Sequence, residues 1–190
     1  MIKKNKTYNE PAFWENLISE EPIIDSLIDN FSQIKSEALR AYKYANFLYD
    51  NYPASNLNKK IKWYFIEPGN DWKIAPFFGG RYDVNANKKA TKIKLLISDL
   101  TAFFVRLICP KTYLLLKNGF RSKKILNAYF AKLGPGSQIK PHIHPITNGI
   151  CRMNIHLGIF CDPSATITVG EETKTWENGK ILAFKNSGPY

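Results

Sequence analysis

Residues 166–184, TITVGEETKTWENGKILAF, carry the clearest structural pattern in this 190-residue chain. Runs rich in Thr, Ile and other strand-forming residues alternate with two short turn segments, GEE at 170–172 and ENG at 177–179. Connections this short join antiparallel strands, and Asn-Gly is a strong signal for a tight hairpin. The stretch therefore predicts three short antiparallel strands. The predicted strands are 166–169, 173–176 and 180–184.

The residues before this stretch extend the same pattern. Turn-forming segments, GPG at 134–136 and DPS at 162–164, divide the second half into further candidate strands. These are 125–133, 138–142 and 152–160. In the last of them, Arg152, Asn154 and His156 alternate with apolar residues and share one face. Three polar side chains on one face indicate either a solvent-facing side or hydrogen-bonding partners inside the fold.

The first half of the chain has helical periodicity. Apolar residues recur at helical spacing from residue 24 to about residue 49, and again at 93–108, where a Cys-Pro pair follows. Between these helices, the segment 63–66 predicts a short strand. The Gly, Asn and Pro residues of 67–92 predict a loop.

No repeat or low-complexity linker divides the chain, so the sequence predicts one domain over residues 1–190. Residues 1–120 would form a mostly helical lead-in, and residues 121–190 a sheet-rich core. Short antiparallel strands after helices predict an α+β fold, in which the helices support a sandwich or barrel.

The chain is basic, with 27 Lys and Arg against 16 Asp and Glu and a net charge of +11. Residues 100–161 contain nine basic residues and no Asp or Glu. Such a surface attracts anions, whether nucleic acid, acidic lipid or acidic small molecules. Biased base composition of the gene would produce the same excess of Lys and Asn. Charge alone therefore selects no function.

Cysteine content and hydropathy bear on the compartment. Three cysteines, an odd number without CxxC spacing, predict free thiols in a reducing compartment. The charged start of the chain lacks the apolar region of a signal peptide. The most apolar run, 95–116, is interrupted by Asp99, Arg106 and Lys111, which favours a buried helix over a membrane span. We therefore expect a cytoplasmic protein without a transmembrane segment.

The three histidines of the chain are the candidate metal ligands. His142 and His144 are two residues apart, so on a strand both rings would lie on one face and could share a metal ion. An open non-haem iron site usually combines two histidines with a carboxylate. Residues 100–161 hold no Asp or Glu, so a carboxylate ligand must come from elsewhere or be absent. The alternative for each histidine is an ordinary surface or core residue.

Four segments of the second half resemble, in order and spacing, the aspartyl/asparaginyl β-hydroxylase-like family of Fe(II)/2-oxoglutarate oxygenases. They are CPKT at 109–112, LGPGSQIKPH at 133–142, RMNIHLG at 152–158, and TWENGK at 175–180 with the following Phe184. The resemblance covers roughly residues 105–186. As a set, these segments are a far more specific signal than the two histidines alone.

The resemblance implies a double-stranded β-helix, also called a jelly-roll or cupin-like fold. It implies an enzyme that binds Fe(II) and uses O2 and 2-oxoglutarate to hydroxylate Asp or Asn side chains, other amino acids or small molecules. His142 then becomes the proximal iron ligand, with His144 as the alternative. His156 matches a histidine that contacts 2-oxoglutarate, and Arg152 matches an arginine that contacts co-substrate or substrate. Animal members of the family bind iron through two histidines without a carboxylate.

The chain also departs from the family pattern. Asn154 stands where the family has a second arginine. We expect Asn154 to contact the substrate, and the loss of that arginine weakens the case for an acidic peptide. His144 replaces a small residue. The distal iron-binding histidine is expected at or after Tyr190, where the sequence stops. Six predicted strands are fewer than the eight of a jelly roll, so we expect a fold lacking its last strands and an active full-length parent.

Two other functions fit parts of the sequence. A catalytically inactive jelly-roll binding module would explain an incomplete iron site. A nucleic-acid binder would explain the charge and the aromatic residues, but no known DNA- or RNA-binding motif is present. The sequence favours an amino-acid, peptide or small-molecule substrate over nucleic acid.

Overall fold

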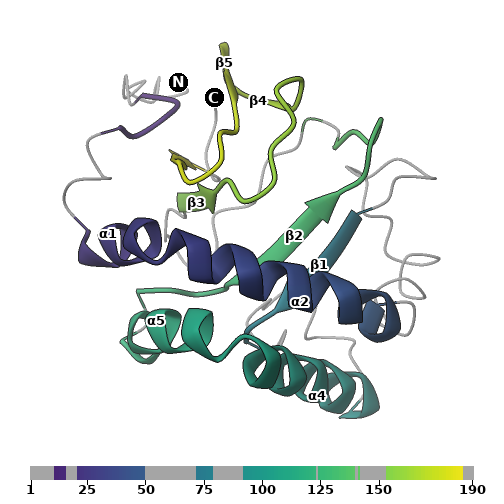
Figure 1. Ribbon diagram of the computed structural model, residues 1–190. Helices are drawn as coiled ribbons and strands as arrows, with labels where there is room; N and C mark the ends of the chain where they lie inside the picture. The colour runs from purple at the N-terminus through teal and green to yellow at the C-terminus, as the bar shows by residue number, and fades with distance from the viewer. Residues whose placement is uncertain are drawn as a thin grey trace, which may run out of the picture. The chain divides into compact units, whose positions relative to one another are not determined.

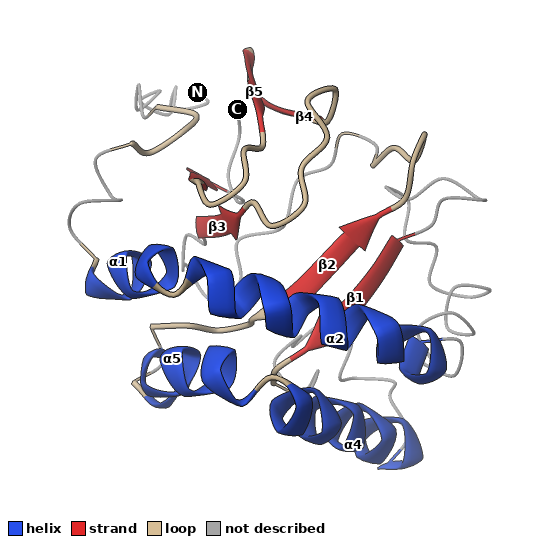
Figure 2. Ribbon diagram, in the orientation of Figure 1, coloured by secondary structure: helices blue, strands red, loops and turns tan. Residues whose placement is uncertain are grey.

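The computed structural model describes residues 11–15, 21–49, 72–78, 92–122, 124–139, 141 and 153–185. The chain forms two compact units, Asp29–His142 and Met1–Ile28 together with Ile143–Tyr190. Figure 1 shows the helices and strands of both units, all labelled except β6, and Figure 2 distinguishes helices from strands by colour.

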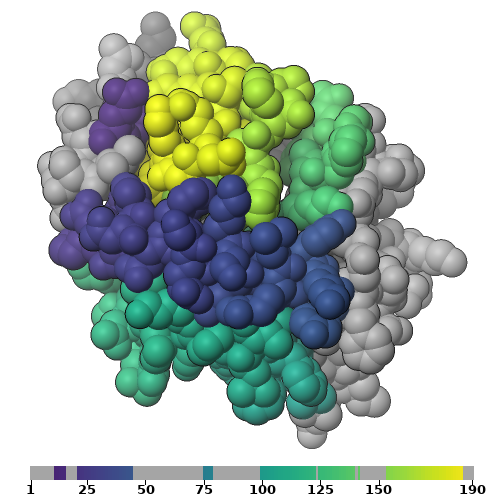
Figure 3. All heavy atoms as spheres, in the orientation of Figure 1, coloured from purple at the N-terminus to yellow at the C-terminus, as the bar shows by residue number. Residues whose placement is uncertain are grey.

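The described part of the unit Asp29–His142 combines helices with one pair of strands. The helices are α2 (Phe31–Tyr49), α4 (Lys92–Ile108) and α5 (Pro110–Arg121), and the strands are β1 (Trp72–Pro76) and β2 (Tyr129–Leu133). Helices α2 and α4 contact β1 and each other, and α5 contacts both helices. Figure 3 shows α2 packed directly against α4 and α5. The two strands are antiparallel, with Trp72 opposite Leu133 and Pro76 opposite Tyr129.

Aromatic residues fill the core of this unit at the end of β1. The Phe77 ring meets Phe130 edge-on with centroids 5.0 Å apart, and Phe78 stacks on Phe120 at 3.8 Å. Burying one such ring contributes about 1.5–3 kcal/mol. The other buried apolar residues of the described part of this unit come from the three helices, β1 and the junction between α4 and α5. They are Ile34, Ala38, Ala41, Ala75, Ala102, Val105, Cys109 and Leu116.

The predicted helix from residue 24 to residue 49 is divided in two, and this corrects the sequence prediction. Helix α1 spans Pro22–Asp29, and α2 begins at Phe31. Between them Asn30 forms a turn, and its carbonyl accepts the first hydrogen bond of α2 from Ile34 N at 3.0 Å. Asn is among the preferred residues for starting a helix, whereas apolar spacing alone does not reveal such a break.

Helix α5 begins where the sequence predicted only the end of α4. Pro110 is its first residue, a position at which the missing N–H causes no loss. The N-cap residue Cys109 makes no side-chain capping bond. Instead, Glu37 of α2 accepts hydrogen bonds from the backbone N–H groups of Lys111 and Thr112, at 3.0 and 2.8 Å. The start of α5 is therefore stabilised from another helix.

Strand β1 lies inside residues 67–92, which the sequence predicted to be loop, and that prediction is wrong for 72–76. The run Trp-Lys-Ile-Ala-Pro is too short to show a clear alternation of apolar and polar residues. Gly, Asn and Pro residues surround it. Its pairing with β2 supplies the hydrogen bonds that the local sequence does not indicate. The predicted strand at 63–66 lies outside the described residues.

The other unit is built from short antiparallel pairs. Strand β3 (Met153–Leu157) pairs with β6 (Ile181–Lys185), and β4 (Thr166–Val169) pairs with β5 (Glu172–Thr175). Gly170 has φ of 61° in the turn between β4 and β5, as the predicted hairpin requires. On the other edge of β6, Phe13 bridges Phe184, and Trp14 N donates to Ala183 O at 2.8 Å.

These elements confirm the α+β class in its coarse form. Helices combine with small antiparallel sheets, and the strands of the described ranges form no closed barrel. Strands β2 and β3 are shorter than the predicted runs 125–133 and 152–160, because bends and irregular backbone occupy the remaining described positions. The described positions of 138–142 belong to no named strand. None of the described helices is long and apolar enough to cross a membrane.

Candidate functional site

Strand β3 carries the two predicted site residues that the structure describes, Asn154 and His156. They lie two positions apart, so their side chains project from the same face of the strand. Across the pair, β6 places Phe184 opposite Asn154 and Leu182 opposite His156. Both polar side chains are half-buried. The polar face of this strand thus has partners within the fold rather than facing only water.

Two aromatic rings enclose the imidazole of His156. Trp176, which follows β5, lies nearly parallel to it, with ring centroids 6.0 Å apart and planes at 15°. Phe184 meets the imidazole edge-on at 4.8 Å. Burial among these rings lowers the pKa of His156 to about 4, because a charged imidazolium would lose its hydration there. His156 is therefore neutral at neutral pH.

A hydrogen bond fixes which nitrogen of His156 carries the proton. The indole Nε1–H of Trp176 donates to His156 Nδ1 at 3.3 Å. A neutral imidazole has one N–H, so a ring that accepts at Nδ1 carries its proton on Nε2. His156 then presents an N–H donor at Nε2, which suits a carboxylate or carbonyl oxygen. Trp176 lies in the TWENGK segment, from which no role for it could be predicted.

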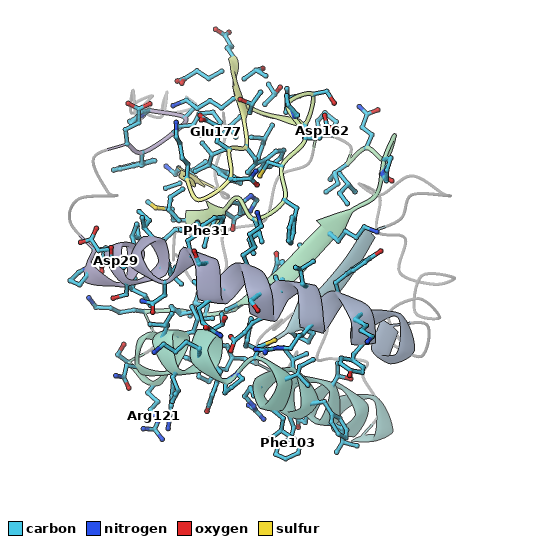
Figure 4. The ribbon with its side chains drawn as sticks, in the orientation of Figure 1. Asp29, Phe31, Phe103, Arg121, Asp162 and Glu177 are labelled. Atoms are coloured by element: carbon cyan, nitrogen blue, oxygen red, sulfur yellow. The ribbon has the colours of Figure 1, made fainter. Side chains whose placement is uncertain are left out.

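Two backbone hydrogen bonds join Gly158, two residues after His156, to the turn that follows Trp176. We call this contact the Gly158 crossing. Gly158 N donates to Lys180 O at 3.0 Å, and Gly179 N donates to Gly158 O at 2.8 Å. Gly179 has φ of 77°, a conformation that favours glycine. The segment from Trp176 to Lys180 thereby turns across the end of β3. Figure 4 labels Glu177 on this turn.

The segment CPKT has a structural role in α5. Burial raises the pKa of the Cys109 thiol to about 12, and the carboxylate of Glu37 adds to the shift. The thiol donates to Glu37 O at 3.4 Å and would not act as a nucleophile at neutral pH. Thr112 donates its hydroxyl to Glu37 Oε2 at 2.6 Å.

The other predicted site residues, His142, His144, Arg152 and Tyr190, lie outside the described residues. Their assignments therefore stay predictions. Within the described ranges, no three His, Cys, Asp or Glu side chains gather in a way that could hold a metal ion.

A hollow of about 570 Å³ lies between residues 13–15, β5 and the start of β6. Lys174 of β5 binds Glu15 there, and this hydrogen bond and ion pair lower the pKa of the Glu15 carboxyl. His156 is not among the residues that line it. The hollow is therefore distinct from the candidate site on the polar face of β3.

The low pKa of His156 makes stability depend on pH. Unfolded histidine titrates at about 6.5, so between that value and about 4 the unfolded chain binds a proton that the folded chain does not. Stability should be full above about pH 6.5 and fall as the pH decreases toward 4, by about 1–3 kcal/mol from this residue. Urea denaturation at about pH 7 and about pH 4.5, compared between wild type and His156→Gln, measures the effect. The variant should lose less stability on acidification, and equal losses would contradict the assignment.

Comparisons with known proteins bear on the whole chain. The family model for aspartyl/asparaginyl beta-hydroxylase matches residues 28–188. The human aspartyl/asparaginyl beta-hydroxylase is 30% identical over 167 residues, which are 87% of this chain and 18% of the human protein. The mouse protein of the same name is 37% identical over 84 residues, which are 41% of this chain and 10% of that protein. Human aspartate beta-hydroxylase domain-containing protein 2 is 34% identical over 82 residues, which are 42% of this chain and 21% of that protein.

This chain spans less than a quarter of the length of each of these relatives. The family match nevertheless extends over most of the chain, from α1 to beyond β6, and includes the strand that carries His156. The resemblance inferred from the four sequence segments is thereby confirmed. The chain belongs to the aspartyl/asparaginyl β-hydroxylase family.

Proposed function

We propose that the protein is an Fe(II)- and 2-oxoglutarate-dependent hydroxylase. Its substrate would be an amino-acid side chain of the Asp or Asn type, free or in a peptide, or a small molecule. Family membership supports a hydroxylase and gives no support to the inactive binding module. The observation that carries the co-substrate assignment is His156, a neutral imidazole whose Nδ1 accepts a hydrogen bond from Trp176.

The environment of His156 fits a carboxylate of 2-oxoglutarate. A neutral ring with its proton on Nε2 can donate one directed hydrogen bond to a carboxylate oxygen. Because Nδ1 accepts the hydrogen bond from Trp176, the imidazole proton stays on Nε2, and Nε2 remains a hydrogen-bond donor. A positive charge for the dianion would come from Arg152, which lies in the same family-like segment. Asn154, on the same face of β3 as His156, would offer its amide to the substrate.

The iron assignment rests on the family and on the available donor types. His142 would ligate the iron, with His144 as the alternative, and a distal histidine is expected at or after Tyr190. Imidazole nitrogens suit iron among several metals. Iron bound there would allow O2 to act as the oxidant, with one oxygen atom going into a C–H bond of the substrate and the other into 2-oxoglutarate, which would be oxidised to succinate and CO2. The strand pairs β3–β6 and β4–β5 would be parts of a double-stranded β-helix.

Binding measurements on three variants test the proposal. We expect His142→Ala to abolish binding of Fe(II) under anaerobic conditions, and His144→Ala to leave it largely intact. We expect His156→Ala to retain the metal but to weaken 2-oxoglutarate binding by about 10–100-fold, since a hydrogen bond to a charged group contributes about 1.5–3 kcal/mol. Metal content and calorimetric titration with 2-oxoglutarate give both results without an activity assay.

Trp176→Phe provides the matched control for the His156 assignment. It keeps an aromatic ring beside His156 but removes the N–H that fixes the tautomer. Its 2-oxoglutarate affinity should fall, but by less than that of His156→Ala. A well-folded chain that binds no metal would overturn the iron assignment. Unchanged 2-oxoglutarate affinity in His156→Ala would overturn the role of that histidine.

A further inference from the structure

Helix α4 exposes most of its large apolar residues between positions 99 and 108, where the structure describes its side chains. Four of them lie at positions i, i+3, i+4 and i+7, a spacing that gathers side chains on one face of a helix. They are Leu100, Phe103, Phe104 and Leu107, which are 48%, 48%, 49% and 58% exposed. The rings of Phe103 and Phe104 also contact each other, with centroids 5.9 Å apart. We name these four residues the α4 apolar face.

On the buried side of this part of α4 the residues are smaller. Thr101, Ala102 and Val105 are 4%, 0% and 0% exposed, on the side that meets β1 and the neighbouring helices. A helix at the surface of a protein ordinarily buries its largest apolar residues and exposes polar ones. The reverse order in α4 places a contiguous apolar surface in contact with water. Surfaces of this kind mark interaction sites.

The helices α4 and α5 of this unit are basic. Together they contain six Lys and Arg and a single acid, Asp99. Arg106 lies on α4 itself, and α5 carries further basic residues, including Lys117 and Arg121. In Figure 4, Phe103 projects from α4 toward the lower edge of the view, and Arg121 projects from α5 along the same edge. The apolar side chain of Phe103 and the basic side chain of Arg121 thus lie on the same side of this unit.

We infer that the α4 apolar face docks on an anionic membrane surface. Phe and Leu side chains would enter the boundary between headgroups and acyl chains, while the Lys and Arg residues of α4 and α5 contact acidic headgroups. This is peripheral binding, in which the helix lies in the plane of the interface. It does not depend on the proposed enzymatic function.

Charge argues against a second copy of this chain as the occupant. Two copies would each bring a net charge of +11 and a basic border into the same interface. Like charges held that close oppose association, whereas an acidic lipid surface is attracted to the same border. The membrane therefore satisfies both the apolar and the basic parts of the surface.

Vesicle binding by the full chain tests the inference. We expect the protein to sediment with vesicles of phosphatidylcholine and phosphatidylglycerol at least about tenfold more tightly than with phosphatidylcholine alone, and to be released by high salt. The double variant Phe103→Ser, Leu107→Ser should lose about tenfold or more of that binding. Both positions are exposed, so the variant should keep the thermal stability of the wild type. Leu39→Ser, at an exposed apolar position of α2, is the matched control and should bind as the wild type does.

Three results would overturn the inference. One is failure of the wild-type chain to bind either kind of vesicle. Another is equal binding by the wild type and the Phe103→Ser, Leu107→Ser variant, which would mean that charge alone attracts the protein. The third is self-association that the double variant abolishes, without vesicle binding, which would assign the face to a second copy.

Discussion

Replacing Glu37 with alanine should lower the free energy of unfolding of the unit Asp29–His142 by about 3–5 kcal/mol. The side chain of Glu37 is 1% exposed, so its carboxylate is kept from water by the surrounding helices. Without it, the backbone N–H groups of Lys111 and Thr112 and the hydroxyl of Thr112 would lose their acceptor. Each buried donor left unpaired costs about 1–3 kcal/mol.

The position of this carboxylate explains why the effect should be so large. It lies at the first turn of α5, where the helix dipole favours a negative charge. Pro110 supplies no N–H and Cys109 supplies no side-chain cap, so Glu37 is the acceptor that the structure provides for this turn. The bond from Arg40, at 3.4 Å, is longer and comes from a half-exposed side chain. The contribution of Glu37 therefore comes from capping α5 more than from the ion pair.

Chemical denaturation, together with amide hydrogen exchange in α5, would measure the change. Glu37→Ala should remove protection from α5 first, since this helix loses its cap. Arg40→Ala is the control and should cost less than about 1 kcal/mol, as exposed ion pairs usually do. A Glu37→Ala protein within about 1 kcal/mol of the wild type would show that water can replace the carboxylate at this helix start.

The contact between Glu37 and α5 shows which parts of the fold can be predicted from the sequence and which cannot. The helical segments were predictable because apolar spacing along one chain segment is a local property. Helix α5 was not, because Pro110 after Cys109 usually marks the end of a helix. Its use as a first residue depends on Glu37, which is 74 positions from Lys111 in the sequence. Strand β1 was missed for a similar reason, since its partner β2 comes more than fifty residues later.

The candidate site, too, could be predicted from the sequence only in part. The segment RMNIHLG placed His156 among the candidate residues through a resemblance, without any information on its surroundings. Its neutral state and its tautomer come from Trp176 and Phe184, which reach it only through the β3–β6 pairing and the turn after β5. No spacing rule in a single sequence predicts a contact between a residue on one strand and a residue twenty positions later that follows another strand. A short polar run on a strand predicts that partners are needed, but it does not identify them.

Replacing Gly158 with alanine should destabilise the unit that contains β3 by about 3 kcal/mol or more. A Cβ at this position would lie 2.2 Å from Glu177 O, 2.7 Å from Cys161 Sγ and 3.0 Å from Glu177 C. Two of these three atoms belong to the backbone, so no change of side-chain rotamer relieves the clash. The turn would have to move away from the end of β3. Overpacking of this kind costs about 1–3 kcal/mol, and each lost hydrogen bond adds about 1 kcal/mol.

Gly170→Ala is the matched control, because it tests loss of a glycine without a clash. Gly170 has φ of 61°, and a Cβ there would meet nothing within 4 Å. The substitution should cost only the strain of a left-handed backbone, about 1–2 kcal/mol. Thermal or urea denaturation of the two variants would compare crowding at Gly158 with conformational strain at Gly170. Equal losses in the two proteins would mean that the segment at Glu177 shifts without resistance.

The Gly158 substitution should also affect the candidate site, and this separates a local change from general unfolding. Gly158 follows His156 by two residues, and Glu177 directly follows Trp176. If the segment at Glu177 moves away from Gly158, the indole of Trp176 therefore also moves away from the imidazole of His156. His156 would then lose the hydrogen bond at Nδ1 and gain access to water, which should raise its pKa from about 4 toward the ordinary value near 6.5. Proton NMR titration of the imidazole would follow this shift in folded Gly158→Ala protein. A His156 that still titrates at the wild-type value in a destabilised Gly158→Ala protein would show that Trp176 is held in place by contacts other than the Gly158 crossing.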